Sequence, residues 1–127
     1  MKPLILIVED NERNRKLVRT ILEFRGFEVV ECTDGEPALA LAKSRRPVLI
    51  LMDIELPKLD GISALQRLRA DAETASIPVI AVTASVTSSQ RERIATAGFN
   101  AFIAKPIDVE EFGNTIERFA GKAGASP

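Results

Sequence analysis

Five short apolar segments recur along the chain, and they restrict its fold more than any other feature. They are LILIV (4–8), FEVVE (27–31), VLILM (48–52), PVIAVT (78–83) and NAFIA (100–104). Their short length and their content of Val, Ile and Leu predict β-strands. The first, third and fourth are apolar on both faces, which is typical of central strands in a parallel sheet that helices cover on each side.

Segments with helical spacing lie between these strands. They cover residues 11–26, 34–46, 61–70, 88–98 and 108–121. The first is expected to turn one apolar face inward through Leu17, Val18, Ile21, Leu22 and Phe24. The last is expected to bury Val109, Phe112, Ile116 and Phe119. Five alternating βα units with right-handed crossovers predict an α/β fold, a doubly wound three-layer sandwich around a parallel five-stranded sheet.

The size and charge of the chain exclude several classes of protein. Its 127 residues fit one domain, expected at 1–120, with 121–127 as a flexible tail. The 17 basic and 18 acidic residues give a net charge of -1, so there is no bulk attraction to nucleic acid or to an anionic membrane. No apolar run is long enough to span a membrane, and the N-terminus enters a strand rather than a signal peptide. We therefore expect a cytoplasmic protein with no nucleic-acid or membrane partner.

Two residue types limit the chemistry. The chain has no histidine, which excludes a Ser-His or Cys-His nucleophile pair and a His-rich zinc site. Cys32 is the single cysteine, so it cannot form an internal disulfide, and its strand-like surroundings favour a small core residue over a reactive thiol. Any reaction must rely on carboxylates, hydroxyls, lysine or a hard metal ion.

Polar residues end four of the five predicted strands. They are Glu9-Asp10, Asp53, Thr83 and Lys105. Ligands of such folds bind at the carboxyl ends of the strands, so these side chains should meet at one edge. Taken alone, each has an ordinary alternative: Asp10 or Asn11 can cap a helix, Thr83 suits a strand, and Lys105 suits a solvated surface. Asp53 is harder to explain in this way, because no helix begins directly after it.

The three acidic residues together predict a metal site and a nucleophile. At close range Glu9, Asp10 and Asp53 would repel one another unless a cation joined them. Oxygen ligands without His or Cys favour a hard divalent ion, and an incomplete carboxylate set suits Mg²⁺ better than Ca²⁺. With a metal ion and a lysine ammonium beside it, the Asp53 carboxylate could attack a phosphorus atom.

Four motifs together resemble the receiver domain of bacterial two-component response regulators. They are LIVEDN (6–11), LMDIELPKLDG (51–61), AVTA (81–84) and AKP (104–106). The resemblance extends from about Leu4 to Phe119 and is greatest for the DivK-like single-domain response regulators. It implies the flavodoxin-like strand order 2-1-3-4-5. It also implies a signalling protein that catalyses only its own phosphorylation and dephosphorylation and is not otherwise an enzyme.

The resemblance assigns the acidic residues to phosphate and metal. Asp53 would accept a phosphoryl group from a phosphohistidine of a sensor histidine kinase or a histidine phosphotransfer protein. Asp10 would bind Mg²⁺ directly and Glu9 through water, and the backbone carbonyl of Glu55 would complete the protein ligands.

The remaining motif residues would sense the phosphate. Lys105 would contact the phosphoryl group, and its bond to Pro106 is expected to be cis. Thr83 would move its hydroxyl onto the phosphate. Phe102 matches an aromatic switch position where many family members have tyrosine, and simple core filling remains an alternative. The surface formed by 88–98, 100–104 and 108–121 would then change and control a downstream protein target.

The sequence is also compatible with other functions. The protein could be a phosphorelay intermediate that passes its phosphate to another histidine. A flavin- or nucleotide-binding protein is disfavoured, because EDNERN (9–14) is acidic where a phosphate would bind. A phosphate-independent binding module would be expected to lack the acceptor or the lysine. The basic residues of the first predicted helix form either a solvated face or a docking patch for an acidic partner; they are Arg13, Arg15, Lys16 and Arg19. We expect the protein to be a monomer or a weak dimer.

Overall fold

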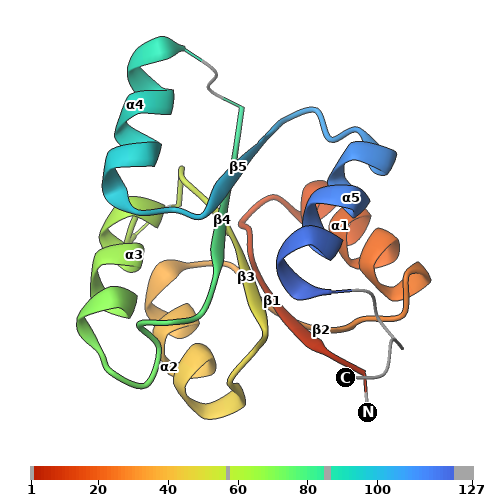
Figure 1. The fold of residues 1–127 in the computed structure, drawn as a ribbon, viewed down its shortest axis with the longest axis horizontal. Coiled ribbons are helices and arrows are strands. Elements are labelled where there is room, and N and C mark those ends of the chain that lie inside the picture. Colours follow the sequence, from red (N-terminus) through yellow and green to blue (C-terminus); the bar gives the residue numbers. More distant parts are fainter. Residues whose placement is uncertain (1, 57, 85–86, 122–127) are drawn as a thin grey trace.

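The computed structural model describes residues 2–56, 58–84 and 87–121, and it contains a five-stranded parallel sheet (Figure 1). The strand order is β2-β1-β3-β4-β5, so the predicted fold and order are confirmed. The strands are β1 (Leu4–Val8), β2 (Glu28–Cys32), β3 (Leu49–Asp53), β4 (Val79–Thr83) and β5 (Ala101–Ala104). Apart from Gly121, the predicted flexible tail at 121–127 lies outside the described residues.

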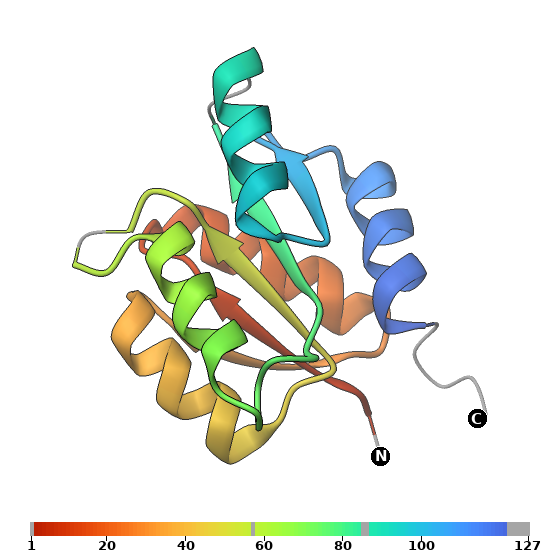
Figure 2. The same cartoon turned by 60° about the vertical axis from the view of Figure 1, so that its left-hand side comes forward.

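Helices cover both faces of the sheet. They are α1 (Glu12–Phe24), α2 (Gly35–Arg45), α3 (Gly61–Ala70), α4 (Ser88–Ala97) and α5 (Val109–Ala120). Figures 1 and 2 show α1 and α5 on one face and α2, α3 and α4 on the other. Each helix begins after a side chain that accepts a hydrogen bond from a backbone N–H of its first turn; these caps are Asn11, Asp34, Asp60, Thr87 and Asp108. Across the described residues, no helix combines the length and the apolar character needed to cross a membrane.

The core has two halves, because successive strand residues point to opposite faces of the sheet. In β1, Ile5 and Ile7 pack with α1 and α5, whereas Leu6 and Val8 pack with α2, α3 and α4. The five residues of β3 and the five of β4 are all buried, as expected for central strands of a parallel sheet. Asp53 is therefore the last residue of a buried strand, where the sequence had placed it just beyond the strand end.

Three helical residues that were predicted to face the core are exposed. Leu17 is 39% exposed, Phe24 92% and Val109 54%, while Val18, Ile21 and Leu22 of the first helix are buried. Phe24 is the last residue of α1 and Val109 the first of α5, so the sheet covers neither. Leu17 lies within α1, and all three exposed residues line an open groove between α1 and α5. The predicted periodicity was right for the helix faces, but it does not say where the sheet that covers them ends.

Cys32 behaves as the sequence suggested. Its partly buried side chain packs against the core, and its thiol donates to the carbonyl of Asp34 at 3.6 Å. Burial raises the pKa of the Cys32 thiol to about 11. The thiol is therefore protonated at neutral pH, where it is a poor nucleophile.

Gly61 allows the start of α3 to pack against the end of β3, where Asp53 lies. It is the first residue of α3, and its N–H donates to the Ile54 carbonyl at 3.0 Å. A Cβ atom at this position would lie 2.5 Å from the Asp53 carbonyl oxygen and 2.9 Å from the Ile54 Cα. Only glycine allows this close approach of α3 to the end of β3.

We expect Gly61→Ala to lower the free energy of unfolding by about 1 to 3 kcal/mol, because backbone atoms must move to admit the methyl group. The chain has no Trp or Tyr, so urea unfolding is best followed by far-ultraviolet circular dichroism.

Gly113→Ala in α5 is the matched control. The three atoms nearest to its Cβ would all belong to the guanidinium of Arg25, the flexible end of a side chain that pairs with Glu117 at 2.7 Å. Alanine favours the helix over glycine, and loss of a partly exposed ion pair costs little, so the net change should stay within about 1 kcal/mol. Equal losses in the two variants would contradict the assigned role of Gly61.

Candidate functional site

The carboxyl edge of the sheet gathers the polar residues that the sequence singled out. Asp53 and Thr83 are the last residues of β3 and β4, while Glu9 and Lys105 directly follow β1 and β5. Glu9, Asp53 and Thr83 are buried. Parallel pairing of all strands places these four chain positions at the same edge, although they are far apart in the sequence.

Lys105 bridges the two buried carboxylates. Its Nζ lies 2.7 Å from Oε1 of Glu9 and donates a hydrogen bond to Oδ2 of Asp53 at 3.0 Å. The exposed fractions of the side chains are 14% for Lys105, 5% for Glu9 and 7% for Asp53. Solvent therefore screens this cluster weakly, and its charges interact more strongly than a surface ion pair.

Backbone N–H groups hold the other two carboxylate oxygens. Oδ1 of Asp53 accepts from the Glu55 N–H at 2.9 Å, and Oε2 of Glu9 accepts from the Asn11 N–H at 3.2 Å. Asp53 thus orients the start of the loop after β3 rather than capping a helix. Asn11 caps α1, which settles which of the two candidate caps is used.

The cluster keeps a surplus of negative charge. Burial, followed by the neighbouring Asp53 carboxylate, raises the pKa of Glu9 to about 7, although Lys105 and the Asn11 N–H favour its ionised form. Burial opposes the charge of Lys105, but its contacts with Glu9 and Asp53 outweigh this and raise the pKa of Lys105. One ammonium group is shared between two buried carboxylates, so the charge of the pair is not fully balanced.

A hard divalent cation fits this surplus. Glu9, Asp10 and Asp53 each offer one carboxylate oxygen, and these atoms lie within 4.8 Å of one another. Asp10 is exposed, and the three carboxylates line an open cleft of about 500 Å³ with Glu55, Ala84 and Lys105. Oxygen ligands on one side of an open cleft leave positions for water or phosphate, which suits Mg²⁺.

The other motif residues lie around this centre. Thr83 ends β4, and its carbonyl accepts a hydrogen bond from the Lys105 N–H at 2.9 Å. The Lys105–Pro106 peptide bond is cis, the geometry that the resemblance implied. Phe102 does not line the cleft; it is partly buried against the core, with the guanidinium carbon of Arg91 at 5.3 Å from its ring centroid.

Two contacts of the site were missed by the sequence reasoning. The buried Asp34 carboxylate accepts hydrogen bonds from the N–H groups of Gly35 at 2.6 Å and Leu59 at 3.2 Å, so it also fixes the loop after β3. Arg15 donates to the Glu9 carbonyl at 3.0 Å. Asp34 was predicted only as the first residue of a helical segment, and Arg15 only as one of four basic residues. The charged Glu31 in an apolar strand was the available signal for a buried ionic partner.

We expect Asp53→Asn to lower the pKa of Glu9, because the hydrogen bond and the charge of Asp53 both raise it. A ¹³C NMR titration of the Glu9 carboxyl carbon without Mg²⁺ measures this. In the wild type, Glu9 has a pKa of about 7 in the folded state and the ordinary value of 4.5 in the unfolded state. Between these two pH values the folded state binds the proton more tightly, so the contribution of Glu9 to stability rises as the pH falls from about 7 to 4.5. Asp53→Asn should narrow the window.

Glu55→Gln is the control for this titration. Glu55 is exposed, and its side chain is not among the causes of the Glu9 shift. A Glu9 pKa that stays unchanged in Asp53→Asn, or that falls equally in both variants, would mean that the two buried carboxylates do not interact as described.

Comparison with known proteins agrees with this architecture. The chain matches the response regulator receiver domain family over residues 5–117. It is 46% identical over 123 residues to the polar-differentiation response regulator DivK of Brucella anthropi, a match that covers 97% of this chain and 100% of that protein. The DivK protein of Brucella abortus is 45% identical over the same length, with the same coverage.

Solved structures show the same fold. The receiver domain of the sensor histidine kinase PA1611 from Pseudomonas aeruginosa has a TM-score of 0.89 and 36% identity, covers 95% of this chain and 99% of its own, and has a magnesium ion coordinated in its active site cleft. The chemotaxis protein CheY4 of Vibrio cholerae has a TM-score of 0.87 and 24% identity, covers 94% of this chain and 99% of its own, and is a likeness of fold alone. Since one family accounts for nearly the whole chain, and the DivK proteins align with it along their full length, this chain belongs to the response regulator receiver domain family of two-component signalling proteins.

Proposed function

We propose that this protein is a single-domain response regulator that accepts a phosphoryl group on Asp53. The observation that carries this proposal is the position of the Lys105 ammonium, which lies between Asp53 and Glu9 in an oxygen-only cluster at the sheet edge. A lysine held against a buried carboxylate can neutralise the oxygen charge that a phosphoryl group brings.

The proposed transfer uses the chain's own residues in distinct roles. An Asp53 oxygen attacks the phosphorus of a phosphohistidine on a sensor histidine kinase or a histidine phosphotransfer protein. The P–O bond of an acyl phosphate forms, the P–N bond breaks, and the departing imidazole nitrogen takes a proton from solvent. Lys105 then contacts the phosphoryl oxygens, and the Glu55 N–H keeps the carboxylate oriented. Glu9, Asp10, Asp53 and the Glu55 carbonyl would hold Mg²⁺, which supplies further neutralisation of phosphoryl charge.

The proposed output is a change in the surface formed by α4, β5 and α5. Thr83 would move its hydroxyl toward the phosphate, drawing the chain after β4 inward. The Phe102 ring on β5 would change its packing in response, and its contact with Arg91 links it to α4. This surface would control a downstream protein target, and relay of the phosphate to another histidine is the alternative within the same chemistry.

The setting that we propose follows from composition and family. The small net charge gives no reason to expect a nucleic-acid or membrane partner, and the single cysteine fits a reducing cytoplasm. A monomer or weak dimer suffices for the chemistry, since one chain supplies all the proposed site residues. The acidic cleft argues against a flavin or nucleotide, and the meeting of Asp53 with Lys105 argues against a phosphate-independent module.

We expect acetyl phosphate with Mg²⁺ to add one phosphoryl group to the wild type and none to Asp53→Asn. Intact-mass spectrometry after a rapid quench measures the adduct, and excess chelator should prevent it. Asp60→Asn is the matched control, because asparagine can still cap α3 and leaves the cluster untouched. If chelator has no effect, the metal role is wrong. If the adduct forms equally in Asp53→Asn, the acceptor assignment is wrong.

We also expect Mg²⁺ to raise the midpoint of thermal unfolding of the wild type, since a ligand that binds only the folded state stabilises it. Asp10→Asn should lose most of this increase, because it removes a proposed ligand and leaves the Lys105 bridges in place. Glu12→Gln is the control, because Glu12 is also exposed and lines the same cleft. This substitution removes one negative charge, as Asp10→Asn does. The same loss in both variants would indicate general charge screening rather than a specific metal site.

A further inference from the structure

The main chain of Glu9 is fixed on both sides, although it lies beyond the end of β1. Its N–H donates to the carbonyl of Cys32, the last residue of β2, at 3.1 Å. Its carbonyl accepts from Nη1 of Arg15 at 3.0 Å. The side chain of Arg15 therefore supplies a hydrogen bond at the point where the sheet ladder ends and the acidic Glu9-Asp10 pair begins.

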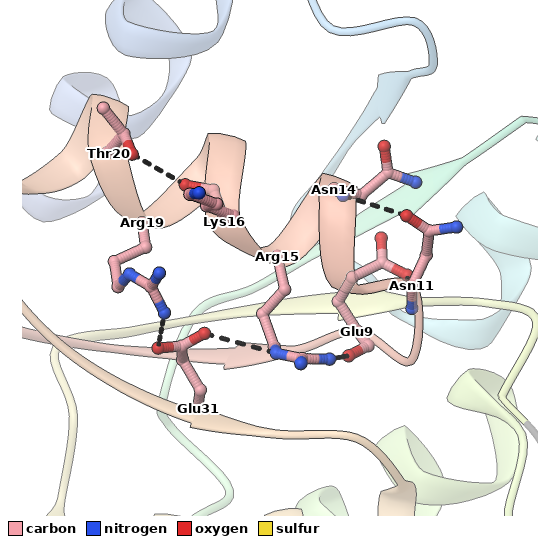
Figure 3. Close-up of polar contacts among 8 residues, drawn as sticks. All are labelled: Glu9, Asn11, Asn14, Arg15, Lys16, Arg19, Thr20 and Glu31. Atoms are coloured by element: carbon pink, nitrogen blue, oxygen red, sulfur yellow. Dashed lines mark hydrogen bonds and ion pairs between the residues drawn. The ribbon is translucent and has the colours of Figure 1, made fainter.

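Arg15 is itself held by an acidic residue of the neighbouring strand. Its Nε lies 3.3 Å from Oε1 of Glu31, and Oε2 of Glu31 accepts from Nη1 of Arg19 at 2.7 Å (Figure 3). The side chains of Arg15 and Glu31 are 20% and 23% exposed. Oε1 of Glu31 is buried and accepts no hydrogen bond from the described residues, so the charge of Arg15 is what compensates it.

We infer that Arg15 is a positioning residue for the proposed metal site, with Glu31 as its anchor; the inference rests on the proposed function. Fixing the Glu9 carbonyl limits rotation of the peptide that joins Glu9 to Asp10, and these two residues supply two of the three carboxylates. Groups that orient metal ligands without touching the metal are needed for full affinity. Arg15 acts in this way, through a backbone carbonyl rather than through a ligand side chain.

The geometry requires arginine at this position. The guanidinium uses Nη1 for the Glu9 carbonyl and Nε for Glu31, so two edges of one planar group connect α1, the end of β1 and β2. A lysine ammonium has no second, rigidly placed donor. Arg19 contacts the same Glu31, yet it has no contact with Glu9 among the described residues, which makes it a natural control.

The test compares Arg15→Ala, Arg15→Lys and Arg19→Ala. The first readout is the set of backbone amide chemical shifts of residues 9–11 in metal-free protein. The second is Mg²⁺ affinity by isothermal titration calorimetry. We expect Arg15→Ala and Arg15→Lys to shift these amides and to weaken Mg²⁺ binding about tenfold. Arg19→Ala should leave both readouts close to wild type.

The outcomes separate positioning from simple charge or stability effects. Wild-type affinity in Arg15→Lys would mean that only the positive charge matters, and equal loss in Arg19→Ala would mean that only the Glu31 pair matters; either result overturns the inference. If Arg15→Ala does not fold, Arg15→Lys and Glu31→Gln still decide it. Glu31→Gln keeps the Arg15 contact with Glu9 but weakens the anchor of Arg15, so an intermediate loss of Mg²⁺ affinity is expected. No loss of affinity would mean that Glu31 does not help to position Arg15.

Failure of the inference can be told apart from failure of the proposed function. If the wild type binds no Mg²⁺, the proposed function fails and the role of Arg15 toward the metal fails with it. If the wild type binds Mg²⁺ and Arg15→Ala binds it equally well, only the inference is wrong. Amide shifts of residues 9–11 that do not move in Arg15→Ala would contradict the Glu9 contact whatever the metal does.

Discussion

The Lys105 ammonium is shared between two buried carboxylates, and the properties of the site follow from the charge that it leaves unbalanced. Burial and the neighbouring Asp53 carboxylate raise the pKa of Glu9 to about 7, so ionisation of Glu9 at this edge is costly. A protein whose fold alone mattered would gain little by keeping such a cluster, because buried ion pairs seldom stabilise more than apolar packing does. The cluster therefore indicates chemistry, and the open side of the cleft, where Asp10 is exposed, is where a cation can join it.

The architecture determines that these groups meet. Every strand of a parallel sheet ends at the same edge, so residues that directly follow β1 and β5 lie near the last residue of β3. The surroundings then fix the details: Gly61 lets α3 approach the Asp53 carbonyl, Asp34 holds the loop after β3, and Arg15 holds the Glu9 carbonyl. The Gly61 and Arg15 contacts act on the main chain of Asp53 and Glu9, so these two carboxylates are oriented by backbone geometry as well as by Lys105.

The sequence predicted the sheet and the meeting of the acidic residues well, and it failed where a partner comes from elsewhere in the chain. Apolar strands and capped helices are local patterns, and the carboxyl-edge rule connects them without further information. The exposure of Phe24 depends on where the sheet face ends, which periodicity does not contain. The roles of Arg15 and Asp34 depend on Glu31 and Leu59, and such pairings become visible only when helices and strands are placed in space.

The sparse packing of α4 bears on the proposed switch. On one face, α1 buries Val18, Ile21 and Leu22, whereas in α4 the buried side chain is that of Ile94. A helix that buries little apolar surface costs little to move, so α4 suits a surface that must change in response to a small energy input. Phe102 lies between this loosely held helix and the core, and Arg91 of α4 contacts its ring. Because a phenylalanine ring cannot gain a hydrogen bond in a new position, packing and this cation–π contact would have to supply any preference between its two positions.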